Sequence, residues 1–123
     1  THPAGYELSE KYTKGATITH DQAAALEGAD FVYVKNWSPY EDYGKVFCTD
    51  PAWMLTENLL KHSNNAKVMH CLPVRRNVVV EDAVLDSEHS IVIQQAGNRV
   101  WAAQVVLKEM ILTLMRQESP YLF

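Results

Sequence analysis

The stretch AKVMHCLPVRRN, residues 66–77, decides how the rest of this sequence is interpreted. Its first seven residues are typical of a short buried parallel strand, and Pro73 ends the run because proline has no N–H to give to a ladder. An imidazole, a thiol and two guanidiniums follow at the carboxyl end of the predicted strand. These groups belong to His70, Cys71, Arg75 and Arg76. In open α/β sheets, that edge is where ligands bind.

Further strands and helices alternate on both sides of this stretch. Strands are predicted over residues 16–20, 30–35, 66–72 and 90–94, and helices over residues 22–27, 51–61, 81–85 and 96–116. Such alternation implies right-handed crossovers and a parallel sheet covered on both faces. We therefore expect a three-layer, Rossmann-like α/β domain of about four strands with a long C-terminal helix. No glycine-rich dinucleotide fingerprint follows any of these strands, so a nicotinamide-binding role has no support.

Composition and charge exclude several classes of protein. The 123 residues suit one domain, with 47% apolar and 21% charged residues, and the net charge of -4 comes without a basic cluster. Nucleic-acid and membrane surfaces need concentrated positive charge, so neither partner is expected. Two cysteines without a signal peptide indicate free thiols and a cytoplasmic location. The opening THPAG follows no strand, and we expect a chain that is incomplete at its N-terminus.

Three segments could bind an anion. Arg75 and Arg76 have the fork geometry that matches phosphate or carboxylate oxygens, although an ordinary surface pair is the alternative. Lys35 ends a predicted strand, where it is either a solvated terminus or a point charge for a ligand carboxylate. Asn98 and Arg99 begin the predicted last helix, an arrangement that favours phosphate. If the strand ends meet, these groups converge on one site.

Metal and thiol chemistry fit this sequence poorly. His70 and Cys71 are adjacent, so on a strand their side chains point to opposite faces, and no second pair supplies the other ligands of a zinc site. For the same reason His70 is not aimed at the Cys71 sulfur as a base. The plain alternative is that Cys71 is a small buried apolar residue and His70 a hydrogen-bonded histidine at a strand end.

The motifs resemble those of a known family, the transcarbamylases of the ornithine branch. The carboxy-terminal half of those enzymes carries His-Cys-Leu-Pro, as at residues 70–73, and later Glu-x-x-Asn-Arg, which here reads QAGNR at residues 95–99. Gln95 departs from the usual glutamate, while Arg99 is kept. The resemblance extends from Thr1 to about Leu114.

Within that family, residues 31–37 and 70–77 resemble the enzymes for N-acetyl- or N-succinylornithine. Ordinary ornithine enzymes have an aspartate for the free α-amino group where Lys35 stands. Acylation removes that ammonium charge and leaves the α-carboxylate, which a lysine can pair with. Val79 stands where the acetyl enzymes carry a modified lysine, and this favours the succinyl substrate.

The resemblance implies a function for residues 1–123 as the second, amino-acid-binding domain of a carbamoyltransferase of arginine biosynthesis. The δ-amine of an N-acylornithine would attack carbamoyl phosphate, without metal or organic cofactor, in an enzyme that forms homotrimers. By position, Arg99, His70, Cys71, Leu72 and Arg75 would contact carbamoyl phosphate, and Lys35, Cys71 and Leu72 the acylornithine.

The first domain of the family supplies a Ser-Thr-Arg-Thr loop and a His-Pro-x-Gln segment, and neither occurs here. The chain is therefore expected to lack the carbamoyl phosphate domain and to be inactive alone. Two competing hypotheses are a non-catalytic α/β module that binds a small anion or a partner helix, and a thiol hydrolase using Cys71.

Overall fold

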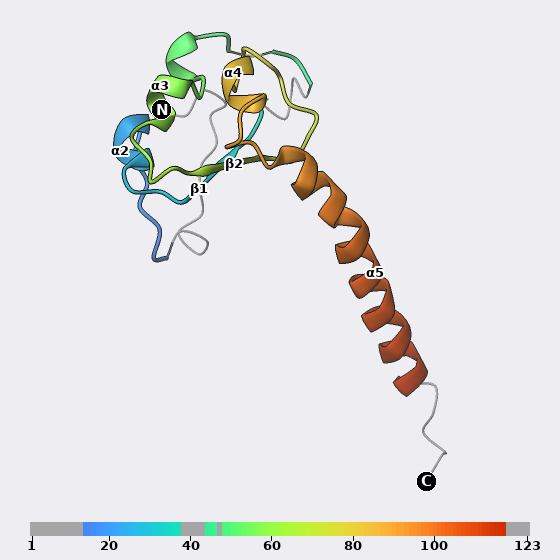
Figure 1. The fold of residues 1–123 in the computed structure, drawn as a ribbon. Coiled ribbons are helices and arrows are strands. Elements are labelled where there is room, and N and C mark those ends of the chain that lie inside the picture. Colours follow the sequence, from blue (N-terminus) through green and yellow to red (C-terminus); the bar gives the residue numbers. More distant parts are fainter. Residues whose placement is uncertain (1–13, 38–43, 47, 118–123) are drawn as a thin grey trace.

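Short helices and strands alternate along the chain and lead into one long helix (Figure 1). The structure, a computed structural model, describes residues 14–37, 44–46 and 48–117. The elements in chain order are α2 (Gln22–Leu26), β1 (Phe31–Val34), the 3-10 helix η1 (Pro51–Trp53), α3 (Glu57–Leu60), β2 (Lys67–His70), α4 (Asp82–Leu85) and α5 (Val92–Gln117).

The sheet is parallel, and β2 lies at its centre. β1 pairs with β2 from Phe31↔Lys67 to Val34↔His70. On the other side of β2, Ser90 forms a single parallel bridge with Val68. Both strands thus end at the same edge of the sheet, as parallel strands must, and the predicted parallel α/β class is confirmed.

Two of the four predicted strands do not form among the described residues. Residues 16–20 pair with nothing there, and Ile18 is 59% exposed. Their β-branched side chains favour a strand only where a neighbouring strand packs against them. Residues 90–94 contribute one bridge and then enter α5 at Val92, whose side chain is buried in the core. A short apolar run does not distinguish a strand from the start of a buried helix.

The helix predicted over residues 51–61 is broken into η1 and α3. Between them, the Leu55 N–H donates to the Val79 carbonyl (3.0 Å), and the Leu55 carbonyl accepts from Glu81 N (2.9 Å). Leu55 therefore gives its backbone groups to a segment about 25 residues further on rather than to a helix. Thr56 then caps α3 by accepting from Leu59 N (3.2 Å). The other two predicted short helices are confirmed as α2 and α4.

One core surrounds β2. Val68 and His70 face inward along the strand, with 0% and 1% of their surface exposed, while Lys67 and Met69 are only half-buried. The apolar core comprises Leu26, Trp37, Leu55, Leu60, Ala66, Val68, Val79, Val80, Val84, Leu85 and Val92. Because the segment that follows the 66–77 motif supplies Val79 and Val80, the loop after β2 is anchored at both ends.

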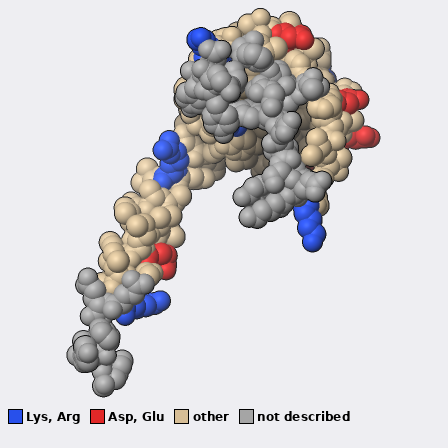
Figure 2. Space-filling view, turned by 180° about the vertical axis from the view of Figure 1, so that it is seen from behind, with Lys and Arg blue, Asp and Glu red and all other residues tan. Residues whose placement is uncertain are grey.

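α5 is the predicted long helix, beginning four residues earlier than Ala96. Its first turn packs on β2, and the rest projects from the globular part (Figure 1). Figure 2 shows few charged side chains along it, in keeping with the four that its sequence contains. Large apolar side chains on the projecting part are 55–68% exposed: Val100, Trp101, Val105, Val106, Leu107, Met110, Ile111, Leu114 and Met115. No helix in the described ranges combines the length and apolarity needed to cross a membrane.

Candidate functional site

His70 closes β2 and is buried. Its Nδ1 accepts from the Leu72 N–H (3.0 Å), so in the neutral imidazole the ring proton is on Nε2. That Nε2 is buried and has no hydrogen-bond partner among the described residues. Burial lowers the pKa of His70, and the charge of Lys35 lowers it further. The structure thus holds a neutral histidine with an unused N–H donor at the sheet edge.

The chain after His70 departs from strand geometry at once. Cys71 is exposed, so it and His70 face opposite ways, as the sequence indicated. Leu72 has a φ of 40°, a backbone conformation that a residue with a Cβ rarely adopts, and its peptide bond to Pro73 is cis. Residues with such a positive φ cluster at functional sites, where the surrounding structure holds them in place. Leu72 is one of the predicted site residues.

Arg75 and Arg76 have different surroundings. The Arg75 guanidinium donates to three backbone carbonyls, those of Gly44 (2.6 Å), Lys45 (3.0 Å) and Trp37 (3.4 Å). Its charge lies near the edge, but its donors are committed to holding residues 44–45. The anion-binding role assigned to Arg75 stays a prediction.

Arg76 forms surface ion pairs, which was the alternative to anion binding at this position. Its guanidinium contacts Asp82 (2.5 Å), the first residue of α4, and Asp86 (2.6 Å), which caps the end of α4. Asn77 also donates to Asp82 (2.7 Å), and this bond together with Arg76 lowers the pKa of the Asp82 carboxyl. Arg76 therefore fastens α4 to the loop.

Lys35 follows β1 directly, and the Val34↔His70 pairing brings it to the same edge as the end of β2. Its side chain is exposed and lowers the pKa of His70 through its charge. A hollow between α2, β1 and η1 opens beside it and is lined in part by Lys35, Trp37, Trp53 and Val79. Lys35 is thus a charged residue among the largely apolar residues that line this hollow.

Arg99 lies further into α5 than predicted. Because α5 begins at Val92, Arg99 is about two turns along the helix instead of in its first turn. The residue nearest the end of β2 is Gln95, whose Oε1 accepts from the His70 N–H (2.9 Å). Arg99 is four residues beyond Gln95 and hence on the same helix face. It is exposed.

Two residues that connect this site were missed as site residues. In the sequence, Gln95 is a departure from the family motif, and Asn36 lies within the segment 31–37 that resembles the acylornithine enzymes. Asn36 links β1 to the loop after β2: its Nδ2 donates to the Pro73 carbonyl (2.8 Å), and its Oδ1 accepts from Arg75 N (3.3 Å). An amide directly after a strand-ending lysine was the available signal.

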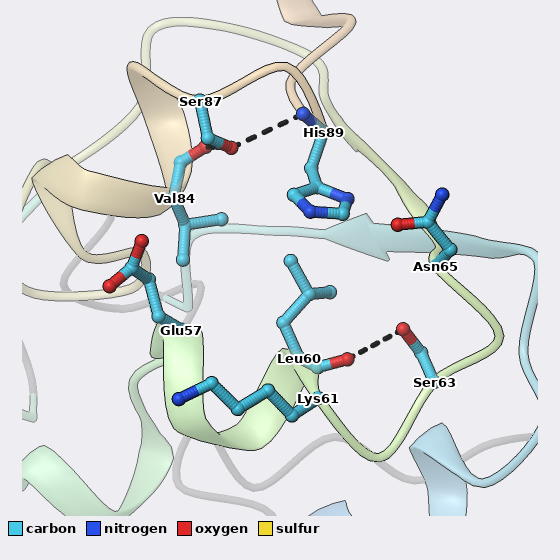
Figure 3. A pocket seen from close by; sticks show the side chains of 8 residues that line it. All are labelled: Glu57, Leu60, Lys61, Ser63, Asn65, Val84, Ser87 and His89. Atoms are coloured by element: carbon cyan, nitrogen blue, oxygen red, sulfur yellow. Dashed lines mark hydrogen bonds between the residues drawn. The ribbon is translucent and has the colours of Figure 1, made fainter.

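A second hollow lies away from these residues. Eight side chains line it, none of them a predicted site residue (Figure 3). Asn65 precedes β2 and His89 precedes the bridged Ser90, so this hollow is at the amino ends of the strands. Both cysteines are free, and no group of three His, Cys, Asp or Glu residues that could hold a metal ion occurs within the described part of the chain.

A parallel α/β unit with its polar groups gathered past the carboxyl ends of two strands is a ligand-binding domain of the Rossmann-like class. Residues 4–110 match the family model described as aspartate/ornithine carbamoyltransferase, Asp/Orn binding domain. The chain belongs to this family.

Individual relatives agree with this assignment. The chain is 48% identical over 116 residues to an N-succinylornithine carbamoyltransferase of Bacteroides fragilis, covering 93% of this chain and 36% of that protein. The ornithine carbamoyltransferase of Pyrococcus furiosus superposes with a TM-score of 0.70 at 32% identity, over 85% of this chain and 38% of that one.

A mutant of N-acetyl-L-ornithine transcarbamylase, solved with carbamyl phosphate and N-succinyl-L-norvaline, superposes with a TM-score of 0.64 at 32% identity over 80% of this chain and 34% of that one. The chain thus spans little more than a third of the length of these relatives.

Proposed function

We propose that this chain is the amino-acid-binding domain of a cytoplasmic N-acylornithine carbamoyltransferase of arginine biosynthesis. The observation that carries the proposal is the register Val34↔His70, which brings Lys35 beside the His70–Pro73 segment at one sheet edge. In the proposed reaction, the δ-amino nitrogen of the substrate attacks the carbamoyl carbon of carbamoyl phosphate. The new C–N bond replaces the C–O bond to phosphate, and the amine proton leaves with the phosphate or solvent.

Lys35 binds the α-carboxylate of the acylornithine in this proposal. Its ammonium group is exposed and, within the described residues, has neither a hydrogen bond nor an ion pair. An uncommitted cation beside an apolar hollow suits a ligand with a carboxylate and an aliphatic chain. A free α-ammonium group would be repelled by the same charge, so unmodified ornithine is a poor substrate.

The carbamoyl group is held by the segment 70–72. The His70 Nε2–H is a buried donor without a partner in the described chain, and a carbamoyl oxygen would satisfy it. In this proposal, backbone carbonyls of Cys71 and Leu72 accept from the carbamoyl and δ-amine N–H groups. Catalysis then rests on positioning and on stabilising charge, with no covalent step at Cys71.

Arg99 and Arg75 supply positive charge for carbamoyl phosphate. Arg99 is exposed on the helix face that includes Gln95, and its guanidinium has no hydrogen bond or ion pair in the described part of the chain. A bidentate contact with phosphate oxygens suits its geometry. Arg75 is the weaker candidate, because its nitrogens already donate to backbone carbonyls.

A second domain completes the site. The relatives are nearly three times as long as the chain, and the exposed apolar side chains of α5 offer a surface for packing. We infer that a carbamoyl phosphate domain covers α5, that the assembly is a homotrimer, and that residues 1–123 alone do not turn over.

The acyl group is succinyl in this proposal. Identity to the N-succinylornithine enzyme of Bacteroides fragilis is 48%, against 34% to an N-acetylornithine carbamoyltransferase of Xylella fastidiosa. Val79, whose side chain is fully buried, has no charge to contribute beside the hollow next to Lys35.

A chimera tests the proposal. The matching segment of the Bacteroides fragilis enzyme is replaced by this chain, and product formation is measured with carbamoyl phosphate and N-succinylornithine, N-acetylornithine or ornithine. We expect turnover with the succinyl substrate, less with the acetyl substrate and none with ornithine. Equal use of ornithine would overturn the acyl assignment. A folded chimera that binds N-succinylornithine without turnover would favour a non-catalytic domain.

Lys35→Glu in this chimera tests the binding role directly. Losing a charge-assisted bond and placing a like charge against the carboxylate should raise KM for N-succinylornithine at least about tenfold. Lys67→Glu is the matched control, because Lys67 lies on the same sheet at its opposite end. A KM that changes equally in both variants would contradict the role of Lys35.

A further inference from the structure

Beyond His70 the two strands lose their backbone ladder. The last paired residues are Val34 and His70, and Pro73 has no N–H with which to continue. Two segments that carry proposed ligand groups, Lys35 on one side and residues 70–72 on the other, would be free to separate. Something other than sheet hydrogen bonds must fix their spacing.

The Asn36 carboxamide takes the place of the missing ladder. It donates to the Pro73 carbonyl (2.8 Å) and accepts from the Arg75 N–H (3.3 Å), so one side chain supplies the donor and the acceptor that a neighbouring strand would offer. These contacts join positions 37 and 39 residues apart in sequence. Asn36 directly follows Lys35 in the chain. Its two hydrogen bonds therefore restrain the position of the Lys35 backbone as well.

The Arg75 side chain also links the loop after β2 to the end of β1. Its guanidinium donates to the carbonyl of Trp37, the residue after Asn36, as well as to Gly44 and Lys45. Trp37 in turn is buried, and its indole N–H donates to the Cys48 carbonyl (3.3 Å). The end of β1 and the loop after β2 are thus held together by side chains reaching in both directions.

We propose that Asn36 is a positioning residue, whose carboxamide sets the spacing between Lys35 and the His70–Pro73 segment. It does not contact substrate. This inference rests on the proposed function only in taking those two segments as the binding groups; the mechanical role of Asn36 stands apart from it. Because small misplacements of reacting groups are costly, loosening this link should lower turnover even when every contact residue is retained.

Hydrogen exchange in the chain itself tests the mechanical role. In Asn36→Ala, the Arg75 amide should exchange about tenfold faster, while amides within β1 and β2 keep their rates. In Asn36→Asp, one carboxylate oxygen can still accept from Arg75 N, so that amide should stay protected although the donor to Pro73 is lost. An Arg75 amide with unchanged exchange in Asn36→Ala overturns the proposal.

Kinetics of the chimera test the positioning role. Asn64→Ala is the control, because Asn64 donates to Asp30 (2.8 Å) and so makes a similar link at the opposite end of the same strands. We expect Asn36→Ala and Asn36→Asp to lower kcat about tenfold with a smaller change in KM, and Asn64→Ala to change neither. Equal effects of Asn36→Ala and Asn64→Ala overturn the proposal. Absence of turnover in the unsubstituted chimera would count against the proposed function, and hydrogen exchange would still decide the role of Asn36.

Discussion

At the residue scale, His70 shows how much a single side chain depends on its neighbours. From the sequence it is equally a ligand-binding histidine or a hydrogen-bonded one at a strand end. In the structure, His70 Nδ1 accepts from Leu72 N, and Nε2 is buried without a partner among the described residues. Its place at the end of β2 was predictable, but its tautomer was not, because the tautomer follows from the backbone path two residues later.

His70 should make the stability of the chain depend on pH. Its folded pKa lies below its unfolded value of about 6.5, so below that pH the unfolded chain binds more protons than the folded one. The free energy of unfolding should therefore fall as the pH drops from about 6.5 towards the folded pKa, whereas above about 6.5 none of it is lost through His70. Urea titrations between these pH values measure the loss.

His70→Gln should remove this part of the pH dependence, because glutamine does not titrate. His62→Gln, at an exposed position, should keep it. If both variants and the unsubstituted chain have the same slope of stability against pH, His70 is not the group responsible.

At the element scale, the helices were predicted where local signals agree and missed where a distant segment intervenes. α2 follows from its Asp21 cap and its apolar residues, and α4 follows from its apolar residues Val84 and Leu85. The break at Leu55 and the early start of α5 do not, because Leu55 bonds to residues 79–81 and Val92 is buried against the core. In both cases tertiary contacts override local propensity.

Thr56 is the cap that starts α3 after the break. Thr56→Ala removes the acceptor for Leu59 N and should lower the free energy of unfolding by about 1 kcal/mol, measured by urea denaturation. Thr113→Ala removes a hydroxyl that bonds within exposed α5 and should cost less than about 0.5 kcal/mol. Similar losses for the two variants would mean that the cap has no special role.

At the scale of the whole molecule, the most prominent feature is the projecting helix α5 with its exposed apolar side chains. An isolated chain in water exposes an apolar face on this helix that includes Val105, Val106, Met110 and Leu114. Exposed patches of this kind are covered by a partner or lead to association. The apolar spacing in the sequence predicted the helix, while only the tertiary structure shows that the rest of the described residues leave this face exposed.

We expect the 123-residue chain to self-associate through α5 as concentration rises, observed by sedimentation velocity. The double variant Val105→Glu with Leu114→Glu should shift the population to monomer, because two carboxylates interrupt the apolar face. Lys108→Glu makes the net charge more negative by the same amount without interrupting the apolar face. It is the control for a pure charge effect and should leave the association intact. A chain that stays monomeric at all concentrations would contradict this expectation.

The sequence by itself determined the parallel α/β class, the buried strand ending at His70, the family and the long helix, because these depend on local periodicity and on a motif whose chemistry is readable. Only the tertiary structure decided that Arg76 is an ion pair on α4, that residues 90–94 enter α5, and that Asn36 joins the two strand ends. Each of those outcomes depends on which distant groups meet, and hydrogen bonds between residues far apart in sequence leave no periodic trace in the sequence.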